Sequence, residues 1–399
     1  VLGDIDLVRA LGRAGIPSAV IADPGSPARF SRHTRRVLPI RDTAPAEQFV
    51  AALVAYGERQ PEPPVLFYED DRGLLLVSRH RDRLREAFRF VVPEAGLVEQ
   101  LVDKAQFQAL AARLHLPVPA GRILHPAEEP LPADFPLRFP LALKPVRKAT
   151  AGWDPVGGGG KATAVASLAE LRALWPRLAA ANLALIAQEL IPGPETRIES
   201  YHVYVDARGA IVGEFLGRKI RTWPAAYGDS TALETTDAAD VLALGRELVK
   251  TLGLRGVAKL DFKRGDDGRL HLLEVNPRFN LWHHLGAVAG VNLPALVFAD
   301  LTGRPRPAPA VARAGVRWCK PWKDFAAART AGMSLATWLR WARRVDAMSA
   351  AAWDDPFPLI GAGLRRGVTA LKERVAGQFV GGSTGEPPLP LHVPTRSDV

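Results

Sequence analysis

Cysteine is almost absent from this sequence, with Cys319 as the single one among 399 residues. An internal disulfide is therefore impossible, and no metal site built from cysteines alone can form. The scarcity fits a reducing compartment, so we expect a cytoplasmic protein. No apolar run approaches the ~20 residues that span a bilayer, and we expect no stable membrane insertion. The chain begins at Val1 without a methionine, inside an expected strand, so we expect that the natural N-terminus lies upstream. Whether a targeting segment precedes Val1 is left open.

Several familiar signatures are also missing. Gly3 precedes an expected helix, but the rest of a G-x-G-x-x-G pattern is not there, so we do not expect a nicotinamide-cofactor site. We find no Ser/His/Asp or Cys/His arrangement for nucleophilic catalysis, and no internal repeat at solenoid periods. These absences remove the commonest dinucleotide and hydrolase explanations.

The net charge is +10, from 52 basic and 42 acidic residues. Nucleic-acid binding would explain this excess, and so would a basic surface around a phosphate-binding cleft. The arginines are spread along the chain, and no basic run is interleaved with stacking aromatics. We therefore favour the cleft and expect no nucleic-acid partner. The length suits two or three packed subdomains.

The first 92 residues alternate between helix and strand patterns. The expected helices span 7–15, 46–56 and 73–88, and the expected strands span 18–22 and 65–68. Such alternation predicts a parallel, doubly wound sheet, whose carboxyl edge binds ligands. Asp70 and Asp71 follow a strand, so they either touch substrate or cap the next helix, and we favour capping.

The rest of the chain mixes helices with antiparallel strand signals. We expect helices over 97–114, 168–181 and 236–252, and strands over 141–145, 183–190, 200–205 and 211–216. A glycine-rich loop covers 157–161. Residues 310–380 are basic and contain several tryptophans, which predicts a helical cap or a dimer contact. Residues 381–399 have a disorder-prone composition.

A β-hairpin is expected over residues 257–276. Two strand-like segments flank Gly265-Asp266-Asp267-Gly268, which is strong hairpin-turn chemistry. Residues two apart in a strand share a face, so Glu274 and Asn276 project together while Leu273 and Val275 face away. Asp261 on the partner strand can join them, and such an all-oxygen set suits magnesium or manganese. From the hairpin alone, an ordinary polar surface is an equally good interpretation.

Three other segments fit a nucleotide site. Lys144 interrupts an otherwise apolar strand and needs a partner, such as a phosphate, unless it guards a sheet edge. Four glycines bring backbone amides close to phosphates, unless they form a plain linker: Gly157, Gly158, Gly159 and Gly160. Backbone groups after strand 183–190 could contact an adenine edge, and Glu195 could accept from ribose hydroxyls.

In this order, these pieces resemble the ATP-grasp superfamily of carboxylate–amine ligases. The matching stretches are 103–104, 141–145, 157–161, 188–193 and 260–279. The resemblance implies a mixed α/β and α+β fold. A doubly wound pre-ATP-grasp domain would cover 1–95. An ATP-grasp domain of two α+β subdomains would cover 96–305, with its lid near 140–190. A C-terminal helical appendage would cover 306–380, followed by the tail.

The resemblance also implies roles for individual residues. Lys104 and Lys144 would hold phosphates, and the four glycines would form a lid over them. The adenine pocket would be lined by Gln188, Glu189, Leu190 and Ile191, with Glu195 at the ribose. Asp261, Glu274 and Asn276 would bind one or two magnesium ions. Arg278 would meet the transferred phosphate, and the γ phosphate would be neutralised by Arg218, Lys219 and, less centrally, Arg221.

Two departures from the family pattern concern metal spacing and the acceptor. Asp261 stands where the family often has glutamate, and its shorter arm changes the reach to a metal. After Asn276-Pro277-Arg278 the chain continues with Phe279-Asn280-Leu281-Trp282-His283-His284 instead of small residues. These side chains either shape the acceptor pocket or pack at a helix start. Adjacent histidines cannot share one helix face, so we do not expect them to bind a metal together.

The expected function is ATP-dependent ligation of a small-molecule carboxylate to an amine, with an amino acid as one candidate amine. It would pass through an acyl phosphate and release ADP and phosphate. A non-catalytic magnesium-ATP-binding protein of the same fold is the alternative. A homodimer through the C-terminal tryptophans is left open.

Overall fold

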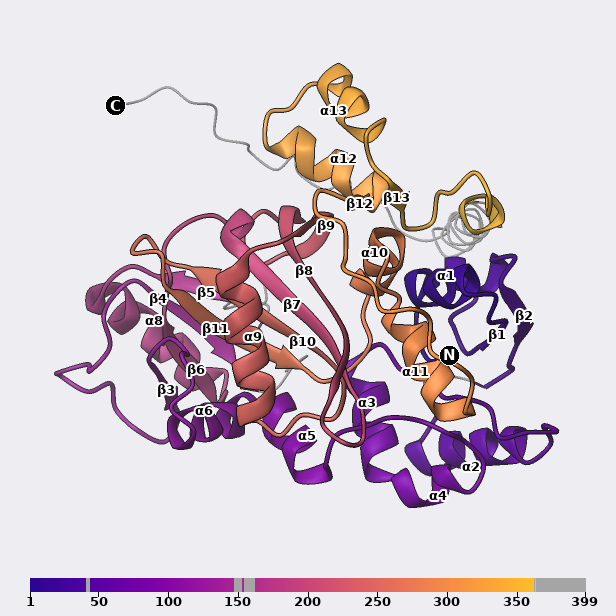
Figure 1. The fold of residues 1–399 in the computed structure, drawn as a ribbon. Coiled ribbons are helices and arrows are strands. Elements are labelled where there is room, and N and C mark those ends of the chain that lie inside the picture. The colour runs from indigo at the N-terminus through magenta and orange to yellow at the C-terminus, as the bar shows by residue number, and fades with distance from the viewer. Residues whose placement is uncertain (41–43, 147–152, 154–161, 362, 364–399) are drawn as a thin grey trace, which may run out of the picture.

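The computed structural model describes residues 1–40, 44–146, 153, 162–361 and 363. The predicted glycine-rich lid, with Gly157, Gly158, Gly159 and Gly160, lies outside the described residues, and so does the expected tail 381–399. Three sheets organise the described chain: a small N-terminal one, a four-stranded one and a seven-stranded one (Figure 1).

The N-terminal part contains the parallel arrangement that the sequence predicts. Its elements are α1 (Ile5–Arg13), β1 (Ser18–Val20), η1 (Pro27–Phe30), β2 (Thr34–Val37), α2 (Ala46–Gly57), α3 (Asp71–Arg79) and α4 (Arg81–Arg85). Strands β1 and β2 pair in parallel. The expected strand 65–68 appears only as isolated parallel bridges, from Leu2 to Tyr68 and from Val65 to Arg89.

Two expected helices are each divided in two. The predicted helix 97–114 is wrong as one unit, because Asp103 has an extended backbone and accepts from the amides of Ala105 and Gln106 at 2.9 Å. A carboxylate that caps in this way ends α5 (Ala95–Val102) and starts α6 (Lys104–Arg113). The predicted helix 73–88 is likewise α3 and α4, joined at His80.

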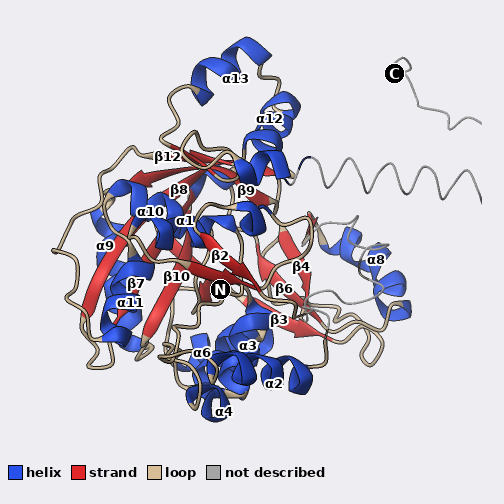
Figure 2. Cartoon of the chain, turned by 90° about the vertical axis from the view of Figure 1, so that its right-hand side faces the viewer, coloured by secondary structure: helices blue, strands red, loops and turns tan. Residues whose placement is uncertain are grey.

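A four-stranded antiparallel sheet follows. Its order is β3 (Gly121–Leu124), β6 (Leu185–Glu189), β4 (Leu141–Pro145) and β5 (Thr163–Val165). Helix α8 (Leu168–Ala180) covers it, and Leu143, Leu171 and Leu178 are buried between them. Figure 2 shows α8 beside these strands. Apolar side chains from both layers therefore fix this sheet as one wall of the molecule.

The seven-stranded sheet has the order β11-β10-β7-β8-β9-β12-β13. Its neighbours are antiparallel except β12 and β13. The strands are β7 (Ile198–Val205), β8 (Ile211–Trp223), β9 (Asp229–Thr236), β10 (Gly256–Arg264), β11 (Leu270–Asn276), β12 (Arg317–Cys319) and β13 (Ala347–Met348). Strand β8 continues well beyond the expected 211–216. It therefore includes residues 217–223, with register shifts after Lys219 and after Arg221. Glu195–Arg197 forms the short η2 beside it.

The two faces of this sheet are covered by different helices. Helix α9 (Ala239–Thr251) packs on one face with Tyr201, Leu260 and Phe262 in a buried cluster. The other face meets α10 (Trp282–Ala289), α11 (Leu293–Thr302) and α1 in a second cluster that includes Phe215 and Leu285. Among the described helices, none can cross a membrane alone; only α10 and α11, bent by 88°, pass that test as a pair.

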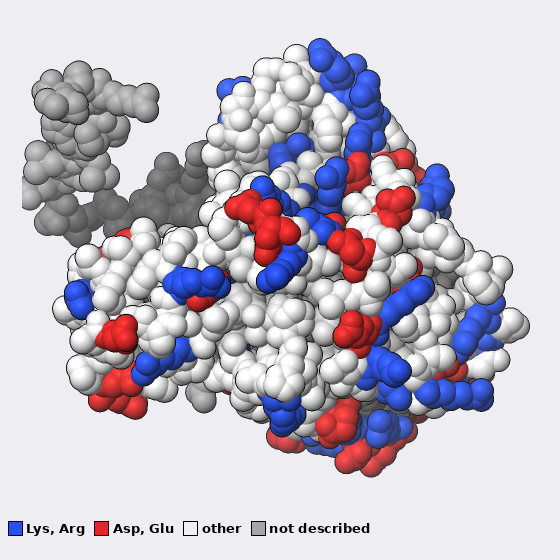
Figure 3. All heavy atoms as spheres, turned by 60° about the vertical axis from the view of Figure 1, so that its left-hand side comes forward, with Lys and Arg blue, Asp and Glu red and all other residues white. Residues whose placement is uncertain are grey.

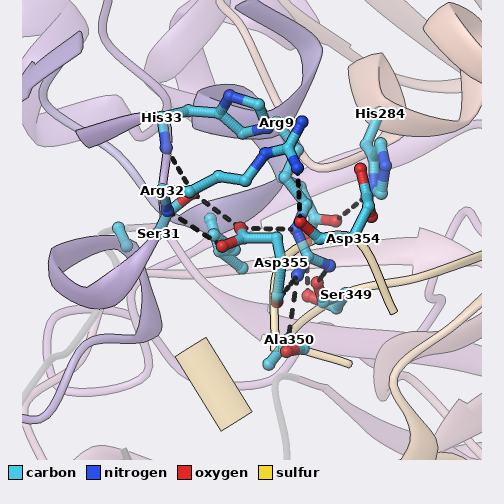
Figure 4. Close-up of polar contacts among 12 residues, drawn as sticks. Arg9, Ser31, Arg32, His33, His284, Ser349, Ala350, Asp354 and Asp355 are labelled. Atoms are coloured by element: carbon cyan, nitrogen blue, oxygen red, sulfur yellow. Dashed lines mark hydrogen bonds and ion pairs between the residues drawn. The ribbon is translucent and has the colours of Figure 1, made fainter. Parts of the chain in front are cut away.

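The C-terminal part is more than a helical appendage. Helices α12 (Pro321–Thr330) and α13 (Leu335–Ala342) are present, but β12 and β13 from the same stretch extend the central sheet. The chain then returns to the N-terminal helix, where Arg9 meets Asp355 at 3.4 Å (Figure 4). The C-terminal segment thus joins the sheet to the N-terminal part.

Candidate active site

A cleft of about 1090 Å³ lies between the four-stranded sheet and the seven-stranded sheet. Its wall includes the expected nucleotide residues Lys104, Lys144, Gln188, Glu189, Leu190, Ile191 and Glu195. It also includes Lys219, Asp261, Glu274, Asn276 and Arg278. One cleft therefore collects the predicted site residues from both sheets, except those outside the described chain and two arginines considered below.

The hairpin carries the predicted metal ligands at the cleft. Asp261 lies directly opposite Glu274 in the β10–β11 register. Asn276 donates to Glu274 Oε1 at 2.8 Å, and Ser200 donates to Asp261 Oδ1 at 2.5 Å. Asp261, Glu274 and Asn276 can each offer an oxygen ligand, which fits a hard cation such as magnesium. Among the described residues, no group of three or more His, Cys, Asp and Glu could hold a metal, so the carboxamide of Asn276 is an essential part of the set.

One detail of the predicted hairpin is wrong. The register shifts between Asp261 and Phe262, so Phe262 pairs with Leu272 and one extra residue enters β11. Such a bulge re-aims the neighbouring side chains. Leu272 and Val275 are buried in the core, whereas Leu273 borders the cleft.

Lys259 is a central residue that sequence reasoning missed. Its Nζ lies 2.5 Å from Asp261 Oδ2 and 3.6 Å from Glu274 Oε1. Burial alone would lower the pKa of Lys259, but Asp261 and Glu274 outweigh burial and raise it. The signal was available, because Lys259, Asp261 and Lys263 alternate along one face of an otherwise apolar strand.

The two carboxyl groups beside Lys259 titrate as a pair. Burial raises the pKa of Asp261, and the negative charge of Glu274 adds to the shift. Burial also disfavours the Glu274 carboxylate, but Lys259 and hydrogen bonds from Asp261 and Asn276 outweigh it and hold the pKa of Glu274 well below its usual range. The ammonium of Lys259 thus stabilises the Glu274 carboxylate at the point where a divalent cation would bind.

The opposite wall presents two lysines. Lys144 donates to Gln188 Oε1 at 3.3 Å, and Lys104 donates to the carbonyl of Pro145. Burial lowers the pKa of Lys144, which is expected for an ammonium group without a counter-ion in contact. Glu189 pairs with Arg138 at 2.9 Å. Lys144 thus borders the cleft from the sheet that would cover a nucleotide, and Lys104 borders it from the start of α6.

Glu195 lies between two cations. Lys219 and Lys263 each lie 3.9 Å from its carboxylate, on different oxygens. Burial lowers the pKa of Lys263, which sequence reasoning did not single out. The trio forms a polar corner where β8 and β10 approach η2.

The structure does not bring Arg218 and Arg221 to the cleft with Lys219. Arg218 pairs with Glu234 at 2.9 Å, and Arg221 pairs with Asp324 at 2.7 Å. Neither arginine is among the described residues that line the cleft. Adjacent residues of a strand point to opposite faces, so the continuation of β8 sends Lys219 to the cleft and Arg218 away from it. A bulge after Lys219 then carries Arg221 to α12.

Arg278 lies at the other end of the cleft, against the N-terminal part. Its Nε donates to Asp71 at 2.6 Å, and its terminal nitrogens donate to the carbonyl of Glu69 at 2.8 Å and to Asn276 Oδ1 at 3.2 Å. Asp70 instead caps α3 through Gly73 at 2.6 Å, as we favoured. Asp70 therefore has the capping role, and Asp71 borders the cleft beside Arg278, where contact with substrate stays a prediction.

The unusual run after Arg278 divides between packing and the cleft. Phe279 packs edge-on against Phe67 with ring centres 5.0 Å apart, and His284 meets Asp6 at 3.1 Å. Asn280, Leu281 and Trp282 line the cleft. Part of this run therefore packs in the interior and part borders the cleft, and its role in an acceptor pocket stays a prediction.

Comparison with known proteins finds a matching family model and similar ligases. Residues 184–321 match the family model described as ATP-grasp in the biosynthetic pathway with Ter operon. The chain is 24% identical to the D-aspartate ligase of Enterococcus faecium (strain Aus0004) over 298 residues, which cover 71% of this chain and 70% of the relative.

Two further likenesses agree. The D-alanine–D-alanine ligase of Pseudomonas putida (strain GB-1) is 23% identical over 218 residues, covering 50% of this chain and 63% of the relative, less than two thirds. The L-amino acid ligase of Bacillus licheniformis has a similar fold, with a TM-score of 0.54 at 14% identity over 76% of this chain and 72% of that one. The expected fold class is confirmed. The expected resemblance to the ATP-grasp superfamily of carboxylate–amine ligases is also confirmed, by the family model over residues 184–321 and by the likeness to these ligases.

Proposed function

We propose that this chain uses ATP and magnesium, or manganese, to join a small-molecule carboxylate to an amine and releases ADP and phosphate. One observation carries the proposal: a single cleft places the oxygen set Asp261, Glu274 and Asn276 opposite Lys144, with Arg278 at its far end. A triphosphate needs this combination of a cation site on one side and ammonium groups on the other.

The proposed nucleotide position follows from the two sheets. Lys104 and Lys144 contact the phosphates, and residues 188–191 border the adenine. Glu195, between Lys219 and Lys263, accepts from the ribose hydroxyls, and Lys219 approaches the γ phosphate. When bound to Asp261, Glu274 and Asn276, magnesium neutralises phosphate charge during the transfer. Gly157, Gly158, Gly159 and Gly160 remain the proposed lid over the phosphates.

The reaction then needs positioning more than covalent catalysis by the protein. A carboxylate oxygen of the substrate attacks the γ phosphorus, the bond to the bridging oxygen breaks, and ADP leaves. The amine nitrogen attacks the acyl carbon of this acyl phosphate, phosphate leaves with the bonding electrons, and the nitrogen releases a proton. Arg278, fixed by Asp71 and Glu69, stabilises charge on the transferred phosphoryl group.

The substrate class and cellular context are also proposals. The relatives are named for D-aspartate, D-alanine and L-amino acids, which supports an amino acid as one of the two substrates. Below the upper projection, Lys and Arg are interspersed with Asp and Glu on the face in Figure 3, and this supports the absence of a nucleic-acid partner. We place the enzyme in the cytoplasm and keep the domain limits 1–95, 96–305 and 306–380, with a homodimer as one possible assembly.

ADP release with a panel of carboxylates and amino acids tests the function. Wild type is expected to release ADP with at least one acid–amine pair, and Glu274→Gln to release it about 100-fold more slowly. Glu199→Gln is the matched control, because Glu199 pairs with Arg264 on the opposite face of the same sheet. Magnesium-dependent ATP binding without ADP from any pair would support the non-catalytic alternative. Equal rates for wild type and Glu274→Gln would contradict the metal assignment.

A further inference from the structure

The side-chain amide of Asn280 is buried in the wall of the cleft. Asn280 is 6% exposed, and its Nδ2 makes no hydrogen bond among the described residues. Its Oδ1 accepts from the amide of Trp282 at 3.0 Å. If Oδ1 and Nδ2 of Asn280 were exchanged, the side-chain NH2 would face the N–H of Trp282, and two donors cannot form a hydrogen bond. The contact with Trp282 therefore identifies which atom of the amide is the nitrogen. Two N–H donors therefore remain unused in the wall of the cleft.

The C-terminal part supplies a cation to the same end of the cleft. Lys320 follows β12, borders the cleft, and is held by its backbone amide, which donates to Thr231 at 2.8 Å. Its ammonium takes part in no hydrogen bond or ion pair within the described chain. Asp6 links the two positions, because it contacts both His284, near Asn280, and Trp318, near Lys320.

Neighbouring groups leave this pair available. Asp6 accepts from Trp318 at 2.9 Å and from Ser349 at 2.6 Å, and Glu69 accepts from the amide of Asp4 at 2.6 Å. Both carboxyl groups thus have hydrogen-bond donors other than Lys320, whose charge acts on Asp4, Asp6 and Glu69 from a distance. Arg278 is held by Asp71, Glu69 and Asn276 beside the metal site. The ammonium group of Lys320 and the NH2 group of Asn280 can only donate hydrogen bonds. Together they would recognise the oxygens of an anion.

We propose that Lys320 and Asn280 bind a second anionic group on the acid substrate, so that the preferred acid is a dicarboxylate or an acidic amino acid. The proposal rests on the proposed ligase function. The reacting carboxylate meets the γ phosphate near Arg278, and the non-reacting one meets Lys320 and the Asn280 amide. The segment that extends the central sheet with β12 thereby sets substrate choice.

Matched acids test this assignment. The probes are D- and L-aspartate, asparagine and isoasparagine, together with malonate, succinate and glutarate and their monoamides. With wild type, at least one diacid is expected to give a kcat/KM for ADP release about tenfold or more above its monoamides. Lys320→Met and Asn280→Asp are expected to remove that preference while leaving the KM for ATP unchanged. Lys320→Arg should keep much of it.

Lys323→Met is the control. Lys323 is exposed on α12, the helix that begins directly after Lys320, and it does not line the cleft. If Lys320 only balances Asp4, Asp6 and Glu69, its replacement will lower every rate alike and leave the ratio of diacid to monoamide unchanged, which would overturn the proposal. No preference in wild type would also overturn it.

Absence of ADP with every pair contradicts the ligase function instead. In that case, isothermal titration of the same acids with magnesium and a non-hydrolysable ATP analogue decides the role of Lys320: weaker diacid binding by Lys320→Met supports it, and equal binding refutes it.

Discussion

The two ends of the cleft are built in different ways. The nucleotide end consists of regular antiparallel strands, in which the predicted ligands are separated by only 15 residues, from Asp261 to Asn276. We call the other end the acceptor end, because the acid and the amine are proposed to bind there. It combines residues from α1, from positions 69–71 at the start of α3, from the start of α10 and from the end of β12. Local alternation therefore organises one end, and long-range contacts organise the other.

A buried polar network holds the acceptor end together. Arg9 donates to the carbonyls of Met348 at 2.7 Å and Asp355 at 3.0 Å, and Ser31 donates to Asp355 at 2.7 Å (Figure 4). The side chains of Arg9 and Asp355 are 4% and 1% exposed. Charges so deeply buried stabilise the fold only when their partners are present. The C-terminal segment is thus required by the N-terminal part.

Removing that partner should break the acceptor end with the largest effect. Arg9→Met leaves Asp355 buried without its cation, so we expect the free energy of unfolding to fall by about 3–5 kcal/mol. Urea denaturation measures the change. Arg13→Met is the control, because Arg13 is exposed at the end of the same helix. A loss below about 1 kcal/mol in Arg9→Met, comparable to that of a surface ion pair, would contradict the account.

Arg278 tests the junction between the two ends. Arg278→Lys keeps the charge but loses the planar set of donors that reaches Asp71, Glu69 and Asn276 together. We expect ADP release to slow about 100-fold, with the KM for ATP little changed. Steady-state kinetics measure both quantities, with Arg269→Lys in the exposed hairpin turn as the control. An unaltered rate would show that the guanidinium does not meet the transferred phosphate.

Glu69 gives the acceptor end a pH dependence. Burial raises the pKa of Glu69 from 4.5 to about 8. Its folded-state pKa lies above its unfolded value, so its contribution to stability is complete below pH 4.5 and is lost as the pH rises toward 8. Glu69→Gln keeps an acceptor for the Asp4 amide and should remove this decline, which amounts to about 1.4 kcal/mol for each pH unit between the two pKa values. Unfolding measured from pH 5 to pH 8.5 checks this; parallel profiles for both proteins would contradict it.

The smallest effect is expected on the outer face of the central sheet. Arg218→Gln removes an ion pair between the exposed Arg218 and the buried Glu234, which keeps Arg317 as a partner. ADP release should therefore change by less than about twofold and stability by at most about 1 kcal/mol. Lys219→Gln, its neighbour on the cleft face, should slow ADP release clearly more. Parallel assays of the two variants compare the faces directly. A larger loss in Arg218→Gln would show that this arginine reaches the nucleotide.

Sequence reasoning succeeded where the two-residue period of a strand determines the face to which a side chain points. Alternation alone placed Glu274 and Asn276 on one face, and the turn residues fixed the hairpin that brings Asp261 beside them. It failed at Leu273, because a bulge changes the alternation without a residue that marks it. It failed at Arg218, because the continuation of β8 through residues 217–223 was not expected.

The acceptor end was harder to predict for a physical reason. Lys320 reaches the cleft only because β12 pairs with β9, and that pairing joins residues more than 80 positions apart. Similarly, Asp6 contacts His284 and Trp318 across most of the chain. No local pattern encodes such contacts, so composition and spacing could indicate a nucleotide site while leaving the acceptor undefined.

Transfer of an isotope label tests the central claim most directly. The acid substrate is labelled with 18O in its carboxylate, and the released phosphate is examined by 31P NMR. If the carboxylate attacks the γ phosphorus, one 18O atom of the acid must appear in inorganic phosphate for each product formed. Product formation with unlabelled phosphate would contradict an acyl-phosphate ligase.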